Sequence, residues 1–172
     1  MDMLDMYKEK NPLTVCLIGV LDGNKLLLVK RKREPLLGHW GLIGGRQTFG
    51  EAIKDVATKE VMEETGFTIK NPRINGMYSE MILDKNDNIK HHFLFIVVKA
   101  NLDETKERSE KVEDTDVEGF KWFNFPINEK DKEYMIPSDV IMLSNFNSDK
   151  PTYKEFVMKE NGNDLKLVRV VE

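Results

Sequence analysis

The chain has 172 residues, of which 40% are hydrophobic and 33% are charged, with a formal net charge of -4. This length suits one domain with a buried core, and the composition is typical of a soluble globular protein rather than a disordered one. The acidic balance disfavours a nucleic-acid binder, which usually carries a basic face. No stretch approaches the about 18–20 apolar residues needed to cross a bilayer, so we expect no membrane partner.

Two features of the sequence indicate a cytoplasmic protein. Residues 1–11 carry several charged side chains and lack the apolar core of a secretion signal, so we expect this segment to be loosely ordered. Cys16 is the only cysteine and lies in an apolar run. It cannot form an internal disulfide, and we interpret it as a buried small hydrophobe in a reduced compartment.

In the N-terminal half, two apolar segments around an Asp-Gly-Asn turn predict a hairpin of strands 13–21 and 25–30. Glycine and proline then interrupt the pattern, which predicts a loop with a short extended piece at 40–43. Residues 51–65 contain no glycine or proline and have helical spacing, and Gly66 is suited to end that helix.

In the C-terminal half, strands 77–83 and 89–100 are predicted to pair across a polar turn, and an exposed acidic loop is expected at 101–116. The remaining elements are predicted to be a strand at 118–123, a helix from Ser138 as N-cap to Phe146, a helix from Pro151 to about Glu160, and a last strand at 165–171. Residues 1–172 are therefore expected to form one mixed domain, with helices against a largely antiparallel sheet. Residues 128–172 would supply the C-terminal helices and the last strand.

The predicted helix at 51–65 carries a glutamate where its buried face should lie. At 100° per residue, four apolar side chains fall within about 100° of Glu60. These are Ile53, Val56, Ala57 and Val61. Glu64 and Glu63 fall within about 60° of Glu60, so three carboxylates gather on or beside the apolar stripe.

Carboxylates in this position are unfavourable for three reasons. Neighbouring negative charges repel each other, partial burial disfavours the charged form, and a helix C-terminus disfavours anions. A bound cation would offset all three, and oxygen ligands without cysteine or histidine favour Mg²⁺ or Mn²⁺ over Zn²⁺. The alternative is a solvated helix face, which the overlap of Glu60 with the apolar stripe disfavours.

The same segment resembles the Nudix box, which reads G-x5-E-x7-R-E-U-x-E-E-x-G-U, with U a bulky apolar residue. The matching residues are Gly45, Glu51, Glu60, Val61, Glu63, Glu64, Gly66 and Phe67, with Lys59 in place of the arginine. The preceding Trp-Gly-Leu-Ile-Gly-Gly resembles the family's W-x-L-P-G-G, with Ile43 in place of proline.

The resemblance implies an α/β/α sandwich and hydrolysis of a phosphoanhydride bond in a nucleoside diphosphate derivative. It implies that Glu60 and Glu64 are the principal metal ligands, with Mg²⁺ as the expected ion and Mn²⁺ as an alternative. Glu63 would be a further ligand, and a carbonyl of Gly44 or Gly45 would complete the shell.

The resemblance also implies catalytic roles. Glu60 is the first candidate for the base that takes a proton from water, Glu63 and a loop acid stay open, and Glu51 would hold the cluster through hydrogen bonds or ligated water. The family often draws this loop acid from a position before a late strand, where Glu110, Glu113, Asp114, Asp116 and Glu118 stand. Lys59 keeps the positive charge of the family's arginine but lacks the planar guanidinium that donates two parallel hydrogen bonds. We therefore expect activity to be retained, in full or at a reduced level.

Three arginines are candidates for contact with substrate phosphates: Arg31 and Arg33, which alternate at a strand end, and Arg46, which follows the double glycine.

Family members that act on ADP-ribose often carry a proline at a characteristic distance beyond the box, and dinucleoside polyphosphate hydrolases often carry a tyrosine there. Residues 81–85 contain neither.

By elimination, we favour nucleoside triphosphates as the substrate, including oxidised ones such as 8-oxo-dGTP. The alternatives are ADP-ribose or another nucleotide sugar, and a non-catalytic nucleotide-binding module on the same fold. The expected partner is a small nucleotide, and the expected assembly is a monomer or small homo-oligomer.

Overall fold

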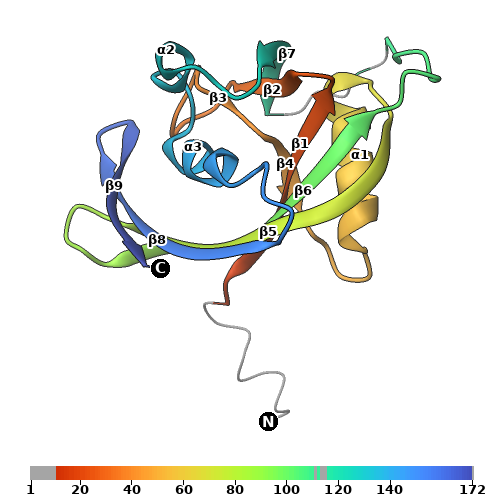
Figure 1. Cartoon of the computed structure of the whole chain (residues 1–172). Coiled ribbons are helices and arrows are strands. Elements are labelled where there is room, and N and C mark those ends of the chain that lie inside the picture. Colours follow the sequence, from red (N-terminus) through yellow and green to blue (C-terminus); the bar gives the residue numbers. More distant parts are fainter. Residues whose placement is uncertain (1–10, 111, 113–115, 172) are drawn as a thin grey trace.

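The computed structural model describes residues 11–110, 112 and 116–171 (Figure 1). Residues 1–10, expected to be loosely ordered, lie outside this part, as do Glu113 and Asp114 of the acidic loop. Within the described residues, no helix is both long and apolar enough to cross a membrane.

One sheet runs through the whole described chain. The elements are β1 (Leu13–Asp22), β2 (Lys25–Arg31), β3 (Trp40–Gly41), β4 (Ile43–Arg46), α1 (Ile53–Thr65), β5 (Ile69–Leu83), β6 (Ile89–Leu102), β7 (Val117–Asn124), α2 (Glu129–Lys132), α3 (Pro137–Ser144), β8 (Thr152–Asn161) and β9 (Asp164–Val171). The strand order is β3-β2-β1-β6-β5-β8-β9, with β4 paired to β1 and β7 to β2. β1 with β6 and β5 with β8 are parallel, and the other pairs are antiparallel, so the predicted mixed, largely antiparallel sheet is confirmed.

Helices pack on both faces of this sheet (Figure 1). Under α1, the fully buried Val56, Ala57 and Val61 join Cys16 and Ile18 in one hydrophobic cluster, which confirms Cys16 as a buried small hydrophobe. On the other face, α3 lies inside the curve formed by β5 and β8, where a second cluster includes Tyr78, Met142, Phe146 and Phe156. The expected α/β/α sandwich is therefore confirmed.

Helix α1 begins two residues later than predicted and ends where Gly66 was expected to end it. Gly66 has φ of 75°, and its N–H donates to the Met62 carbonyl at 2.9 Å. A side chain there would be strained by this φ and would collide with the Ser109 carbonyl. The helix therefore stops at the last turn that carries Glu63 and Glu64.

The helix predicted from Pro151 to Glu160 is wrong, because these residues form β8. Thr152, Tyr153, Phe156 and Val157 are strand-favouring residues, and β5 offers them a complete parallel ladder from Gly76 to Leu83. β8 lies between β5 and β9 in the sheet. Its three consecutive residues 156–158 are all buried, so side chains on both faces of the strand are covered. Pro151 lies just before the strand, where no ladder N–H is required. The predicted last strand is confirmed as β9.

The start of α3 also differs from the prediction. Ile136 is the N-cap and Pro137 occupies the first turn, so Ser138 lies inside the helix, which ends at Ser144 rather than Phe146. The reason is tertiary: the Ile136 N–H donates to the Trp40 carbonyl at 2.9 Å and fixes the chain just before the helix. Residues 128–172 thus supply the short α2, α3 and the β8–β9 hairpin.

Candidate active site

Glu60 lies on the inner side of α1, against β4. Its side chain is only 13% exposed. A β-carbon at Gly45 would overlap the carboxylate of Glu60, so the strand approaches the helix closely only because residue 45 is glycine. Burial raises the pKa of Glu60, and the negative charge of Glu63 raises it further. The helical geometry that placed Glu60 beside the apolar stripe is thus confirmed.

Glu64 lies one turn beyond Glu60 and is more deeply buried, with 7% of its surface exposed. Burial raises its pKa to about 8, and the charge of Glu60 adds to this rise. The Gly44 N–H donates a hydrogen bond to the carboxylate. Its Oε2 atom is buried and has no hydrogen-bond partner among the described residues. An orphaned buried carboxylate oxygen is costly unless something binds it.

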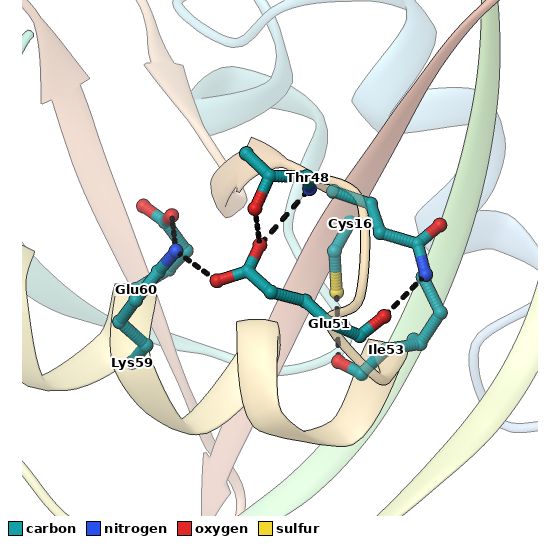
Figure 2. Close-up of polar contacts among 7 residues, drawn as sticks. Cys16, Thr48, Glu51, Ile53, Lys59 and Glu60 are labelled. Atoms are coloured by element: carbon teal, nitrogen blue, oxygen red, sulfur yellow. Dashed lines mark hydrogen bonds and ion pairs between the residues drawn. The ribbon is translucent and has the colours of Figure 1, made fainter.

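Lys59 holds two glutamates together (Figure 2). Its Nζ lies 2.8 Å from Glu51 Oε1 and 3.7 Å from Glu60 Oε1. The other oxygen of Glu51, Oε2, accepts from the N–H and the hydroxyl of Thr48, at 2.9 and 2.5 Å. The hydrogen bond from Lys59 and then those from Thr48 lower the pKa of Glu51 to about 2. Glu51 therefore stays charged and fixes Lys59 beside Glu60.

The donor atoms fit a hard divalent cation better than zinc. Within the described chain, no three acidic, histidine or cysteine side chains are grouped as a complete metal site. Mg²⁺ does not need such a group, because it usually takes one or two carboxylates together with waters and substrate phosphates. Glu60 and Glu64 supply two carboxylates, and the buried Oε2 of Glu64 has no hydrogen-bond partner among the described residues. Burial raises the pKa of the Cys16 thiol to about 12, which keeps this thiol protonated.

A cavity of about 1040 Å³ opens beside these glutamates. Gly44, Gly45, Glu60 and Glu64 form part of its wall. Other parts of the wall come from apolar side chains of the central strands and from polar residues of β5 and α3. These include Val15, Leu17, Ile82, Phe93, Phe95, Glu80, Ser138 and Asp139.

The three candidate arginines have different positions. Arg31 lines the cavity, and its Nε donates to the Pro35 carbonyl at 3.1 Å. Arg46 is exposed and also lines the cavity. Arg33 is not among the lining residues; its Nε lies 2.8 Å from Asp116 Oδ1. Arg31 and Arg46 therefore border the cavity, whereas Arg33 is paired with Asp116.

Among the three candidate loop acids that the structure describes, Asp116 is the one that lies near the glutamates. It lines the cavity, and its charge raises the pKa of Glu64. Glu118 instead pairs with Lys30 at 3.2 Å and is 56% exposed, and Glu110 is exposed. The other two candidates lie outside the described residues.

Two buried acids in the cavity wall were not anticipated from the sequence. Glu80 in β5 and Asp139 in α3 are each only 3% exposed. Strand alternation places Glu80 on the same face as the buried Tyr78 and Ile82, so a signal for Glu80 was present in the sequence. Asp139 carried no such signal, because its partner is the Leu42 N–H, nearly a hundred residues away in the chain.

The fold and the glutamates on α1 define a protein of the Nudix type, and sequence comparison agrees. The NUDIX domain family model matches residues 10–142, and the chain belongs to that family.

Individual relatives match over shorter segments. The chain is 38% identical over 66 residues to the ADP-ribose pyrophosphatase of Methanocaldococcus jannaschii, which is 38% of this chain and 39% of that protein. It is 40% identical over 57 residues, 33% of this chain and 36% of the other, to a Bacillus subtilis protein whose name provisionally assigns it 8-oxo-dGTP diphosphatase activity. The chain thus spans less than half the length of these relatives.

A solved structure matches over nearly the whole chain. It is that of a mutator MutT protein from Bacillus halodurans, with a TM-score of 0.72 and 26% identity. The match covers 92% of this chain and 96% of that one, a larger share of this chain than the family model reaches.

Proposed function

We propose that the protein is a Mg²⁺-dependent hydrolase that cleaves a pyrophosphate bond of nucleoside triphosphates, including oxidised ones. One observation carries the proposal: Glu60 and Glu64 lie one turn apart at the wall of a large cavity, and Glu64 Oε2 has no partner among the described residues. The names of the relatives, which concern ADP-ribose and 8-oxo-dGTP, support nucleotide chemistry.

Glu60 and Glu64 would hold the cation, with Glu63 and the Gly45 carbonyl as further ligands. A bound divalent cation neutralises phosphate charge and lowers the pKa of a coordinated water. Mn²⁺ is the second candidate, because it accepts the same oxygen ligands. The glutamates' mutual repulsion and burial are the reasons that they would bind such an ion tightly.

The proton of the attacking water would pass to a carboxylate. Glu60 is our first candidate, since it lies in the cavity wall, and Asp116 and Glu63 are the next. Glu51, kept charged by Lys59 and Thr48, would position Lys59 against Glu60 rather than take the proton itself. Arg31 and Arg46 would contact phosphate oxygens, for which guanidinium groups are well suited.

Two alternatives are tested by the same experiments. ADP-ribose or another nucleotide sugar is the alternative substrate, favoured by the name of the Methanocaldococcus jannaschii relative. A non-catalytic nucleotide-binding module is the alternative class, and the complete set of Glu51, Glu60, Glu63 and Glu64 argues against it. The single buried cysteine and a nucleotide substrate suit the cytoplasm as the location.

The test is a substrate panel with purified protein. Deoxynucleoside triphosphates, 8-oxo-dGTP and ADP-ribose are incubated with Mg²⁺ or Mn²⁺, and the products are separated by chromatography. We expect pyrophosphate release from triphosphates, with a loss of about 100-fold or more in Glu60→Gln and Glu64→Gln. Asp55→Asn is the matched control, because Asp55 is exposed on the same helix.

Full activity in Glu60→Gln would overturn the catalytic assignment. Cleavage of ADP-ribose in preference to every triphosphate would favour the alternative substrate. Nucleotide binding without cleavage of any substrate would favour the binding module.

A further inference from the structure

The C-terminal end of α1 concentrates negative charge at a place where a helix tolerates it poorly. Its last turn, residues 62–65, carries Glu63 and Glu64 and contains no lysine or arginine. The C-terminus of a helix also leaves carbonyl groups without intrahelical partners and disfavours anions. By itself, this turn would be the first part of the helix to fray, and two of the proposed metal ligands lie in it.

Arg108 contacts this turn from a distant part of the chain, the loop that follows β6. Its Nε donates to the Thr65 carbonyl at 2.8 Å, one of the carbonyl groups that the end of a helix leaves free. The next residue continues the contact, because the Ser109 N–H donates to the Gly66 carbonyl at 2.8 Å. The loop is thus bound to the end of α1 at two consecutive residues.

The guanidinium group of Arg108 also lies over two aromatic rings. It is 4.8 Å from the ring centre of Phe120 and 5.7 Å from that of Phe67. The two rings contact each other edge to face, with their centroids 5.4 Å apart. Phe67 directly follows the glycine that ends α1, and Phe120 lies in β7. Because a cation is attracted to the face of an aromatic ring, Arg108 joins the end of α1 to β7.

We infer that Arg108 is a positioning residue, which holds the metal-binding end of α1 in a fixed place against β7. This inference rests on the proposed function, because it concerns the ligands of the same site. Arg108 is not among the residues that line the cavity, so it would act through the two elements that it joins rather than on a bound ligand.

The two elements carry acids that depend on this placement. Glu64 lies in the last turn of α1, and Asp116 directly precedes β7. The charge of Asp116 raises the pKa of Glu64, so the two carboxylates lie within electrostatic reach of each other. Mg²⁺ requires near-ideal octahedral geometry, and its affinity falls when a ligand is displaced. A loosened last turn would therefore weaken metal binding even though every glutamate is still present.

The test measures Mg²⁺ binding and backbone exchange, neither of which requires catalysis. Calorimetry gives the Kd of Mg²⁺ for the full chain, and hydrogen–deuterium exchange reports the opening of α1. In Arg108→Met, we expect Mg²⁺ to bind about 10-fold more weakly and the N–H groups of residues 62–66 to exchange about 10-fold faster. Arg108→Lys keeps the positive charge and an N–H donor, so it should remain within about 3-fold of the wild type in both measurements. Lys106→Met is the matched control, because Lys106 is an exposed cation of the same loop.

An unchanged Kd for Mg²⁺ in Arg108→Met, with only a lower melting temperature, would overturn the inference, since Arg108 would then merely stabilise the fold. Equal losses in Lys106→Met would also overturn it, because any cation of the loop would then suffice. Arg108 is exposed, so its variants should fold, and their melting temperatures check this. Absence of Mg²⁺ binding by the wild type would overturn the proposed function, whereas faster exchange of residues 62–66 in Arg108→Met would still support the role of Arg108 at the end of α1.

Discussion

The carboxylate of Glu60 occupies the space that a side chain at residue 45 would fill. Gly45→Ala should therefore push Glu60 out of place while leaving the core intact. Because misplacement of a catalytic group by about 1 Å can cost about 100-fold in rate, we expect kcat with Mg²⁺ and the preferred triphosphate to fall roughly 10- to 100-fold. Steady-state kinetics measure this loss.

Gly119→Ala is the matched control for this substitution. Gly119 lies in β7, has no positive φ, and has no atom within 4 Å of the position that an added methyl group would take, so added bulk should be tolerated. Equal kinetics of Gly45→Ala and Gly119→Ala would show that the contact between Gly45 and Glu60 does not matter for catalysis.

Lys59 provides the second prediction. One ammonium group contacts both Glu51 and Glu60, so its charge rather than its shape holds the pair. Lys59→Arg should retain activity, because guanidinium can contact two carboxylates, whereas Lys59→Met should lower kcat about 10-fold or more. An inactive Lys59→Arg variant with a normal melting temperature would contradict this view of Lys59.

Removal of the metal provides the third prediction. If Glu64 holds the cation, Mg²⁺ should raise the melting temperature of the wild-type protein over its value in EDTA, since a ligand that binds the folded state stabilises it. Glu64→Gln should lose this rise, yet be at least as stable in EDTA, because its amide is neutral without having to take up a proton in the buried site. Differential scanning fluorimetry with and without Mg²⁺ measures both effects. A full Mg²⁺ response in Glu64→Gln would exclude Glu64 as a ligand, and Asp55→Asn serves as the control.

The fourth prediction separates two acids at the start of β7. Asp116 lines the cavity, and its charge raises the pKa of Glu64. The nearby Glu118 instead pairs with Lys30 outside the cavity. Asp116→Asn should lower kcat about 10-fold with little change in KM, since it alters the charge near the proposed metal ligands. Glu118→Gln should remain within about 2-fold of the wild type. Equal losses in both variants would remove Asp116 from the site.

The fifth prediction concerns stability and pH. Burial raises the pKa of Glu80 to about 7, above the value of about 4 for an unfolded glutamate, so the folded state binds its proton more tightly. The free energy of unfolding should therefore decrease as pH rises from about 5 to about 7.5. Glu80→Gln should reduce this decrease, by on the order of 1–3 kcal/mol. Urea denaturation in EDTA at several pH values measures it, with Glu104→Gln as the control, and identical pH profiles for Glu80→Gln and the wild type would contradict it.

Local sequence patterns were sufficient to predict the elements whose buried face follows from the spacing of their own apolar residues. Helix α1 follows from its apolar spacing and from Gly66, and the same spacing placed Glu60 on the buried side. β8 was misassigned because Lys154, Glu155, Lys159 and Glu160 resemble the polar face of a helix and Pro151 resembles a helix start. Its strand form depends on the free edge of β5, which no local pattern reports.

The site shows the same division. The glutamates of α1 could be predicted because they share one helix and one motif. Glu80 and Asp139 come from β5 and α3, which meet only through tertiary contacts, such as the hydrogen bond between the side chains of Glu80 and Ser138. Single-element periodicity can mark Glu80 as buried, but it cannot show that a second acid lies beside it.

The β8–β9 hairpin, whose first strand is predicted as a helix by local pattern alone, has a wider consequence. Its turn and the start of β9 supply Gly162, Asn163 and Leu165 to the cavity wall, and the Asn163 carbonyl accepts from Leu36 at 3.1 Å. The family match ends at residue 142, before this hairpin begins. Residues 45–64 and residues 136–165 thus form two separate stretches of the gene that meet at one cavity. Substitutions in residues 136–165 could therefore change which nucleotides the cavity accepts during evolution, while residues 45–64 stayed the same.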